Sequence, residues 1–435
     1  MRTKLLITVV AIIMIVVLLF SVFSGFFGSD FHLLNNKPVV SISYPKNQAT
    51  VASLVMISGT ASDADAADIV ETVEIKIGDG DWTSVDGTNL WSYDWATYSY
   101  EDGSYDISVR SYDGKDYSDV KTITVTLANA QHVDSGSHKW AVFIAAANFP
   151  TDNESKLGNG GLNLAEDMVS FFIDTYDFAT SNIWILFDDG WIRKDNGYGA
   201  RLKTLQERSH EYAITYGGAT KENVMTTLDY VISESNKYED SEVFLWIFSH
   251  GYGDSNNTKT GGKIFQSSEI FLWDDTLTDK ELGALLVPLK SKKTCIIVDA
   301  CYSGGFADKT ILNLHTSLLF RSGIPKNGRI VISGSSKFRP GYASTTEGPL
   351  FSILWFQGLK TGDADGCKPG LLHLGVLRNL RLFKNGEVSV EEAFYYARIQ
   401  LRTDELLSEY REMQPQINDR YPRRGLLLSH KEMFL

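Results

Sequence analysis

Short apolar runs, each ended by glycine, aspartate or another polar turn residue, recur along the C-terminal part of the chain. Runs of this length that are rich in β-branched and aromatic residues predict buried strands. The segments between them are longer and place apolar residues at helical spacing. Strands alternating with helices predict an α/β fold, with helices on both faces of a mostly parallel sheet. The predicted strands are Trp140–Ala146, Ile183–Phe187, Val243–Phe248, Cys295–Val298 and Arg329–Ser333.

Capping residues mark the starts of the predicted helices. Thr220 is a predicted N-cap, and Thr278 with Glu281 and Ser389 with Glu392 have the spacing of capping boxes. Another helix is predicted after the glycine-rich loop at Asp152–Gly161, with Leu164, Met168, Phe171 and Phe172 on one face. Phe351–Leu359 fits a helix or an aromatic strand, and Arg193–Gly217 gives no assignment.

Pro38–Leu127 has a different pattern, in which short alternating strands are separated by Asp-Gly turns. Even spacing of such strands predicts an antiparallel β-sandwich. The stretch resembles the Ig-like modules of bacterial and archaeal surface proteins, for example in its opening Pro38–Pro45 and in Asp102–Tyr105. The predicted strands are Val51–Ser58, Val70–Ile77, Trp91–Trp95, Tyr105–Ser111 and Val120–Leu127.

The N-terminus has Arg2 and Lys4 followed by the apolar run Leu5–Phe23. This run is near the ~20 residues that a membrane helix needs. We expect an uncleaved signal-anchor, with a cleaved signal peptide as the alternative, so that the rest of the chain is outside the cytoplasmic membrane or secreted. The expected division is a signal-anchor in 1–30, an Ig-like sandwich in 38–128 and an α/β domain in 139–435.

Composition narrows the classes of function. The chain is 43% hydrophobic and 22% charged, which is typical of a globular protein. The formal net charge of -13 and the lack of a basic block argue against a nucleic-acid partner. With 3 cysteines the chain is no disulfide scaffold. Cys295 lies within an apolar run and is predicted to be core, whereas Cys367 is predicted to be an exposed loop thiol.

The candidate chemistry lies where two predicted strands end. His250 follows Val243–Phe248 and Cys301 follows Cys295–Val298, and each then enters a glycine turn. If the two strands are parallel neighbours, both side chains meet at one edge of the sheet, where open α/β sheets place their sites. A thiolate with an imidazole beside it is the pair that nucleophilic acyl transfer requires.

These two motifs resemble those of the caspase-like cysteine peptidases. A strand followed by His250-Gly251, and a later strand followed by Asp299-Ala300-Cys301-Tyr302-Ser303-Gly304, is similar to the catalytic motifs of that family. The stretches Trp140–Asn148, Asn182–Asp189 and Thr220–Asn223 are most similar to the legumain branch. The resemblance covers about Lys139–Leu428 and implies the caspase-like fold and cysteine endopeptidase activity on polypeptide substrates.

The resemblance also implies roles for single residues. Cys301 is the implied nucleophile, His250 the implied general acid/base, and Asn148 the residue that orients the histidine. The N–H groups of Gly251 and Cys301 are the implied oxyanion hole. The acidic residue two positions before the nucleophile is implied to line the first specificity pocket; here it is Asp299, and Glu347, Ser335 and Ser336 are expected to line the same cleft.

Specificity and some alternatives stay open at this point. Asp299 favours basic P1 residues, with Asn as the alternative, because the Arg-His pair of legumains is replaced by Leu162-Asn163. A transpeptidase would use the same acyl-enzyme, and a non-catalytic surface protein is the alternative outside enzymes. No cofactor is expected; calcium is a minor alternative at Asp63, Asp65 and Asp68 or at Asp363 and Asp365. Packing is favoured over carbohydrate binding for Trp82, Trp91, Trp95, Tyr98 and Tyr100, and the oligomeric state is left open.

Overall fold

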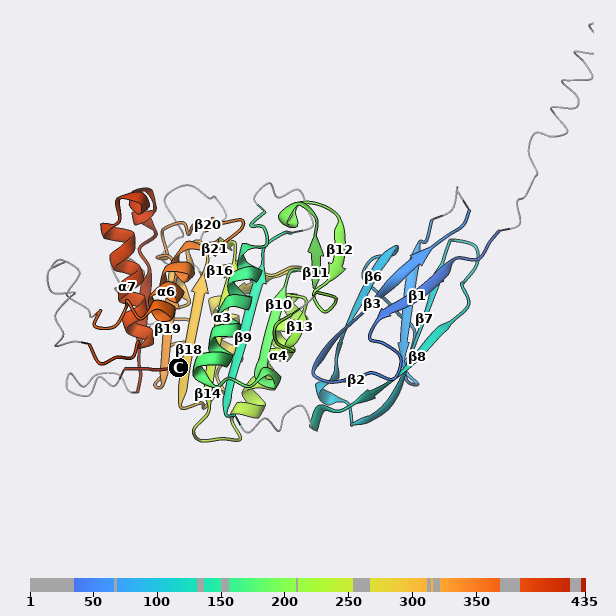
Figure 1. Cartoon of the computed structure of the whole chain (residues 1–435), viewed down its shortest axis with the longest axis horizontal. Coiled ribbons are helices and arrows are strands. Elements are labelled where there is room, and N and C mark those ends of the chain that lie inside the picture. The colour runs from blue at the N-terminus through green and yellow to red at the C-terminus, as the bar shows by residue number, and fades with distance from the viewer. Residues whose placement is uncertain are drawn as a thin grey trace, which may run out of the picture.

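The computed structural model of the chain describes residues 35–65, 69–130, 137–149, 156–208, 210–252, 267–310, 314–315, 321–367, 384–422 and 432–435. Within these ranges no helix has the length and apolarity to cross a membrane. The membrane segment predicted at Leu5–Phe23 lies outside them. Figure 1 shows a β-sandwich at one end of a larger α/β domain.

The first domain is the predicted β-sandwich, built from two sheets in the orders β1-β3-β6 and β2-β8-β7-β4-β5. Inward-facing positions fill its core, among them Trp91, Ile107 and Val109, each 0% exposed. The strands are β1 (Val39–Tyr44), β2 (Thr50–Val51), β3 (Leu54–Ser62), β4 (Thr72–Ile77), β5 (Thr83–Ser84), β6 (Leu90–Ala96), β7 (Gly103–Tyr112) and β8 (Lys121–Leu127).

The strand predicted at Val51–Ser58 is divided between the two sheets. β2 pairs with β8, whereas β3 pairs with β1 and β6. Between them Ser53 has a left-handed backbone (φ 68°), and its N–H donates to the Asn129 side chain at 2.9 Å. A left-handed residue breaks the strand, because extended strands require negative φ.

The second domain has a seven-stranded sheet in the order β13-β10-β9-β14-β18-β19-β22. All neighbours are parallel except β22, which pairs antiparallel with β19. This confirms the mostly parallel sheet. The strands are β9 (Lys139–Ala146), β10 (Ile183–Phe187), β13 (Thr215–Gly217), β14 (Glu242–Ser249), β18 (Lys293–Asp299), β19 (Arg329–Ser333) and β22 (Gln416–Asp419).

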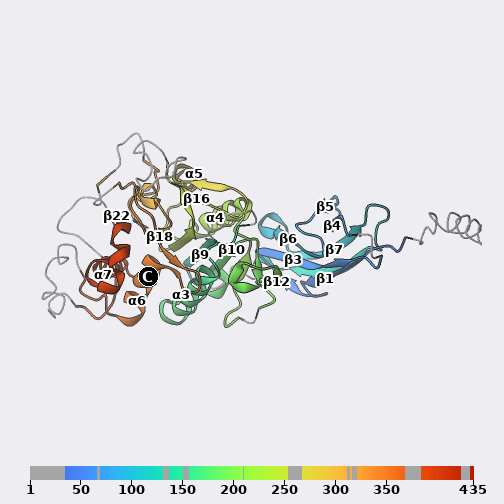
Figure 2. The ribbon, with the colours of Figure 1, turned by 90° about the horizontal axis from the view of Figure 1, so that it is seen from above.

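Helices cover both faces of this sheet, as predicted (Figure 2). Alternate residues of β9 point to opposite faces, so Phe143 packs in one core and Val142 and Ile144 in the other. The first core includes α3 (Gly160–Tyr176), α6 (Leu350–Thr361) and α7 (Val390–Thr403), and the second includes α4 (Lys221–Ser235) and α5 (Asp279–Leu285).

The predicted caps are present. The Thr220 hydroxyl accepts the N–H of Asn223, and both predicted capping boxes form at the starts of α5 and α7. Phe351–Leu359 is helical. The unassigned stretch Arg193–Gly217 contains β12 (Arg201–Thr204) and the edge strand β13. A strand as short as β13 has too few residues for an alternating pattern to be visible in the sequence.

Cys367 corrects a prediction. It is not an exposed loop thiol but is 2% exposed in the core beside α6 and α7. Gly362 ends α6 with a left-handed backbone (φ 76°), and Gly366 N–H donates to the Glu392 carboxylate at 3.0 Å. These contacts turn the loop back toward the helices and bury the thiol. Cys295 is 1% exposed, as predicted.

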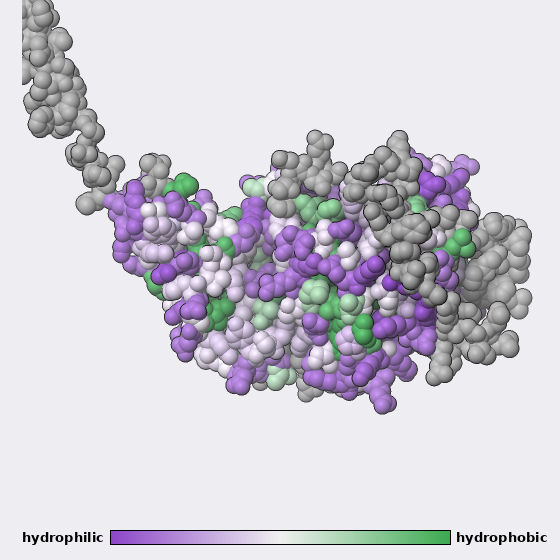
Figure 3. All heavy atoms as spheres, turned by 180° about the vertical axis from the view of Figure 1, so that it is seen from behind, coloured by the Kyte–Doolittle hydropathy of each residue, from purple (hydrophilic) through white to green (hydrophobic). Residues whose placement is uncertain are grey.

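The surface of the described residues is mixed in hydropathy. Seen from behind, it is mainly hydrophilic, with apolar residues in small scattered groups (Figure 3). Single exposed apolar residues are normal on protein surfaces and mark no site by themselves.

Candidate active site

The two candidate catalytic residues leave neighbouring strands of the sheet. β14 and β18 are parallel and adjacent, and Phe248 of β14 lies opposite Asp299 of β18. His250 follows β14 directly, and Cys301 follows β18 by one intervening residue. The convergence of the two strand ends, which the sequence predicted only conditionally, is present in this structure.

One cavity of about 80 Å³ joins these residues. His250, Asp299 and Cys301 line it from the sheet side, and Leu157, Tyr342 and Pro349 are on its other walls. The Phe149 ring, in the segment after β9, lies 5.8 Å from the His250 ring, centroid to centroid. The cavity therefore brings a thiol, an imidazole and a carboxyl group together.

The Cys301 thiol is half-buried beside the backbone of Gly341. Gly341 N–H donates to Sγ at 3.2 Å, and Sγ is 3.6 Å from the Gly341 carbonyl oxygen. Burial raises the pKa of the thiol, the Gly341 N–H lowers it, and the Asp299 carboxylate raises it again. Because the net direction is upward, the resting group is a thiol, and a base is needed to make the thiolate that attacks.

Gly251 brings its backbone against that of Cys301. A Cβ on Gly251 would lie 1.9 Å from the Cys301 carbonyl oxygen, so only glycine fits there. The amides of Gly251 and Cys301 both lower the pKa of the Cys301 thiol, against the larger rise from burial. Backbone donors at this point are suitably placed for the developing oxyanion.

Asp299 lies at the base of the cavity and is 1% exposed. Its Oδ2 accepts two hydrogen bonds from Ser352, from N–H at 2.9 Å and from the hydroxyl at 2.7 Å. Burial raises the pKa of Asp299 to about 6, and these bonds oppose the rise. A Cβ on Gly334 would lie 2.0 Å from Asp299 Oδ1, so only a glycine at this position avoids a clash with the carboxylate.

Ser352 is the functional neighbour that sequence reasoning missed. It lies in the first turn of α6, where backbone N–H groups favour a negative charge. Its hydroxyl also accepts the Trp246 indole N–H at 2.9 Å, which fixes its orientation. The sequence did not predict the contact between Ser352 and Asp299, because Phe351–Leu359 fitted either a helix or a strand. Only the start of a helix places Ser352 against Asp299.

Asn148 belongs to a buried hydrogen-bond network at the end of β9. Its side-chain Nδ2 donates to Asp188 at 2.8 Å and to the Gly158 carbonyl at 3.3 Å, and its Oδ1 accepts the Gly158 N–H at 3.0 Å. The side chain is 1% exposed and its donors are used in these bonds. Asn148 therefore holds the loop before α3 in this structure, and its expected role in orienting His250 stays a prediction.

Ser335, Ser336 and Glu347 also differ from expectation. Ser335 and Ser336 are 0% exposed, and the Ser335 hydroxyl donates to the Ala300 carbonyl at 2.7 Å. Ser335 thus supports the turn that carries Cys301, and it is not among the residues that line the cavity. Glu347 is exposed in the turn between β20 (Ala343–Ser344) and β21 (Gly348–Pro349), and it is not on the cavity wall.

Several residues considered for calcium or carbohydrate binding contact other groups of the protein. Asp65 accepts hydrogen bonds from Asn36, and Asp365 accepts the N–H groups of Asn385 and Gly386; Asp68 lies outside the described residues. Over the part of the chain that the structure describes, no group of three or more His, Cys, Asp or Glu residues could hold a metal ion. Trp91 and Trp95 are buried in the sandwich, and Tyr98 stacks on Tyr230.

Comparison with known families defines the class of each domain. Residues 138–351 match the caspase domain family, and residues 38–109 match the bacterial Ig domain family. The chain therefore has a caspase-like domain preceded by a bacterial Ig-like domain, in agreement with the motifs. No curated protein matches the chain.

Solved structures give distant likenesses to single parts of the chain. Caspase-1 from Spodoptera frugiperda is 12% identical over 66% of this chain and 87% of that one, with a TM-score of 0.36. The fibronectin(III)-like modules of Clostridium thermocellum CbhA are 26% identical over 22% of this chain and 48% of theirs, with a TM-score of 0.19. The endo-beta-1,4-mannanase of Thermotoga petrophila is 17% identical over 23% of this chain and 21% of its own, also at 0.19. The chain spans less than half of the CbhA modules and about a fifth of the mannanase.

Proposed function

We propose that the protein is a cysteine endopeptidase in which Cys301 is the nucleophile and His250 the general acid/base. The observation that carries the proposal is the shared cavity, in which residues from the ends of adjacent parallel strands β14 and β18 face the same space. The caspase family match at residues 138–351 supports the reaction class.

The reaction follows from the groups present. His250 takes the proton of the Cys301 thiol, and the thiolate attacks the scissile carbonyl carbon. The N–H groups of Gly251 and Cys301 stabilise the oxyanion of the tetrahedral intermediate. The intermediate collapses when His250 gives its proton to the leaving amine, which leaves a thioester on Cys301. Water, deprotonated by His250, then attacks the thioester and releases the acid and the thiol.

We further propose that the enzyme cleaves after Lys or Arg. The buried Asp299 carboxylate at the base of the cavity attracts a cation, and the two Ser352 bonds hold it in place. Closer relation to the legumain branch, with Asn at P1, stays a prediction. Action outside the cytoplasmic membrane is also proposed, on the apolar run Leu5–Phe23 alone.

The test compares the full chain in detergent with its Cys301→Ala and His250→Ala variants on fluorogenic peptides that carry Arg, Lys, Asn, Asp or Gln at P1. We expect cleavage after Arg and Lys by the wild type and by neither variant. Cleavage after Asn alone would return the specificity to the legumain type. Activity that survives Cys301→Ala would refute the proposed nucleophile, and aminolysis products with added amines would indicate transpeptidation.

A further inference from the structure

The Ig domain is docked on the peptidase domain through specific polar contacts and is no simple spacer. Trp184 of β10 donates its indole N–H to the Ser53 hydroxyl at 2.9 Å, and Trp191 donates to the Ser92 hydroxyl at 2.9 Å. Each of these bonds joins a buried indole to the sandwich. Figure 1 shows the sandwich beside β10 and β13, at one lateral edge of the sheet.

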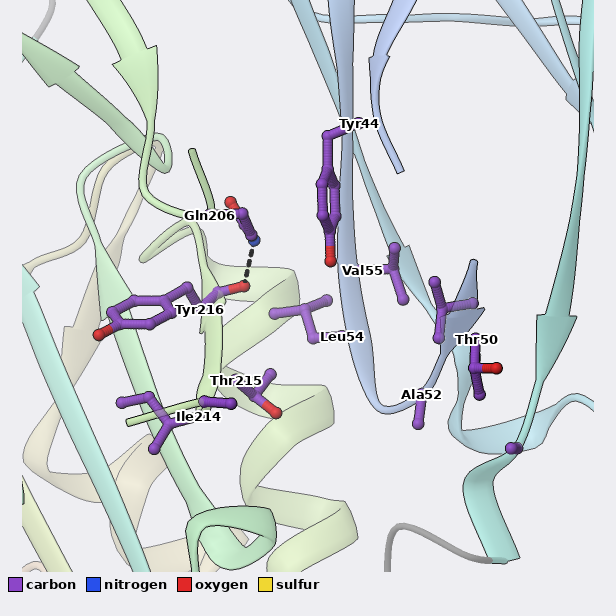
Figure 4. Close-up of a pocket in the computed structure, with 12 residues that line it drawn as sticks. Tyr44, Thr50, Ala52, Leu54, Val55, Gln206, Ile214, Thr215 and Tyr216 are labelled. Carbon is purple, nitrogen blue, oxygen red and sulfur yellow. Dashed lines mark hydrogen bonds between the residues drawn. The ribbon is translucent and has the colours of Figure 1, made fainter. Parts of the chain in front are cut away.

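The contact divides into separate patches, because a cleft of about 430 Å³ lies between the domains. Figure 4 shows Tyr44, Leu54 and Val55 on the sandwich side and Gln206, Thr215 and Tyr216 on the peptidase side. None of the residues that line this cleft is a cysteine, histidine or acid, so it has no catalytic chemistry of its own. The hairpin formed by β11 (Trp191–Arg193) and β12 therefore contacts the sandwich at a place separate from this cleft.

An arginine network attaches this hairpin to the sandwich. Arg201 of β12 makes a salt bridge with Asp86, and it donates to the Leu90 carbonyl at 3.3 Å. The same guanidinium pairs with the buried Asp189 at 2.6 Å, and Arg193 pairs with Asp189 at 2.7 Å. Bidentate arginine–carboxylate bonds have defined geometry, so the network fixes the base of the hairpin.

The turn of the hairpin contacts two loops beside the cavity. Asn196, in a left-handed conformation (φ 53°), accepts the Asn159 N–H at 3.1 Å and donates to the Thr345 carbonyl at 2.8 Å. It therefore joins the loop before α3 to the β20–β21 turn. A Cβ on Gly158 would lie 2.3 Å from the Thr345 carbonyl oxygen, so the backbones pack directly here.

Both loops that Asn196 joins carry cavity residues. Leu157 adjoins Gly158, whereas Ala343 and Pro349 belong to β20 and β21, and all three line the cavity with Cys301 and Asp299. We propose that Asn196 is a positioning residue for substrate binding, and that the docked Ig domain holds its hairpin in place. The inference rests on the proposed peptidase function but concerns residues remote from the reacting atoms.

The test replaces Asn196 with glycine, which adopts the left-handed backbone freely while losing both hydrogen bonds. Asn236→Ala is the matched control, because Asn236 also joins two groups through its amide, the Pro288 carbonyl at 2.9 Å and the Lys290 N–H at 2.8 Å, away from the cavity. In the full chain we expect Asn196→Gly to raise KM for a peptide with Arg at P1 by about 5-fold or more, with kcat within about twofold. The control should keep both constants.

A serine pair tests the contribution of the Ig domain. Ser92→Ala removes the bond to Trp191, and we expect it to raise KM in the same direction, by about twofold. Ser108→Ala, which removes an exposed hydroxyl contact to Thr122 on the sandwich, should have no effect. Equal KM values for Ser92→Ala and Ser108→Ala would overturn the role of the docked domain.

Amide hydrogen exchange tests the role of Asn196 without depending on peptidase activity. We expect faster exchange in residues 341–349 of Asn196→Gly than of wild type and of Asn236→Ala, whether or not any peptide is cleaved. If the wild type cleaves peptides but Asn196→Gly matches it in KM and in exchange, the inference fails while the function stands. If no peptide is cleaved, the function fails and exchange alone decides the inference.

Discussion

Buried polar groups have different surroundings at the lateral edge and at the carboxyl edge of the peptidase sheet. At the lateral edge, polar groups of the peptidase domain find partners on the Ig domain, as Trp184 does with Ser53 and Asn223 does with Asp94. At the carboxyl edge, Asp299 and Cys301 line an open cavity instead. Polar groups that the fold satisfies stabilise it, whereas those directed into a cavity are available to a substrate.

Cys301→Ala is expected to have the largest effect, a loss of activity at the carboxyl edge without a loss of stability. We expect peptide cleavage to fall by more than about 10³-fold, because no other group in the cavity supplies a nucleophile. The thermal midpoint should remain close to that of wild type. Cys295→Ala, within the core on β18, is the control and should retain the rate. More than a few per cent residual activity in Cys301→Ala would contradict the assignment.

Asp299→Asn should be the next largest change. For a peptide with Arg at P1 we expect kcat/KM to fall by about 10²-fold, because a buried charge then lacks its partner. A peptide with Gln at P1 serves as the internal control, since it brings no charge into the pocket. An equal loss for both peptides would mean that Asp299 supports the fold or the catalytic residues rather than specificity.

The pH dependence tests the same carboxylate without mutation. The pKa of Asp299 is about 6 because of burial, so the carboxylate is charged above pH 6 and neutral below it. We expect the preference for Arg over Gln at P1 to decline as pH falls through about 6. Ser352→Ala removes a hydrogen bond to the charged form and should shift this decline to higher pH. A preference that stays constant from pH 5 to 8 would refute the pocket role.

At the lateral edge, Leu54→Ala should reduce stability while leaving the chemistry intact. Leu54 of the sandwich is 4% exposed and belongs to the core of the peptidase domain. We expect a loss of about 2 kcal/mol in the free energy of unfolding, measured by denaturant titration. Leu406→Ala, at a residue that is 86% exposed, is the matched control. Equal stability of the two variants would show that the docking contributes little.

The smallest expected effect is a gain in stability from Asp94→Asn. Burial at the interface, with a smaller contribution from Asp189 and Asp86, raises the pKa of Asp94 to about 6, although the hydrogen bond from Asn223 opposes the rise. Because the folded-state pKa lies above the unfolded one, this group favours the folded state most below about pH 4 and loses that contribution as pH rises through 6. Asp94→Asn should therefore raise the melting temperature at pH 8 by about 2–4 °C and flatten part of its pH dependence. A lower melting temperature at pH 8 would contradict this.

Local patterns in the chain predicted much of the fold. The strands at Ile183–Phe187 and Arg329–Ser333 have the predicted bounds, and the capping residues of three helices are in place. These features depend on neighbours in the sequence. The division of β2 from β3, the edge strand β13 and the burial of Cys367 depend on contacts with distant segments, and no local pattern indicated them.

The candidate site divides in the same way. Motifs at strand ends were sufficient to select His250 and Cys301, because parallel neighbouring strands bring their carboxyl ends together. Ser335 and Ser336 are polar residues near the nucleophile in the fold, yet they point into the protein. Which polar residue near a site faces the cavity depends on the packing of the loops around it.

The sequence by itself determined the order of the domains, the alternation that builds each sheet and the residues that carry the proposed chemistry, since all of these are encoded in short stretches of chain. Only the tertiary structure decided that Ser352 supports Asp299, that Asn148 holds Gly158 and Asp188, and that the Ig domain is attached to the hairpin of Asn196. Each of these depends on hydrogen bonds between residues far apart in the chain, whose geometry exists only once both domains have folded.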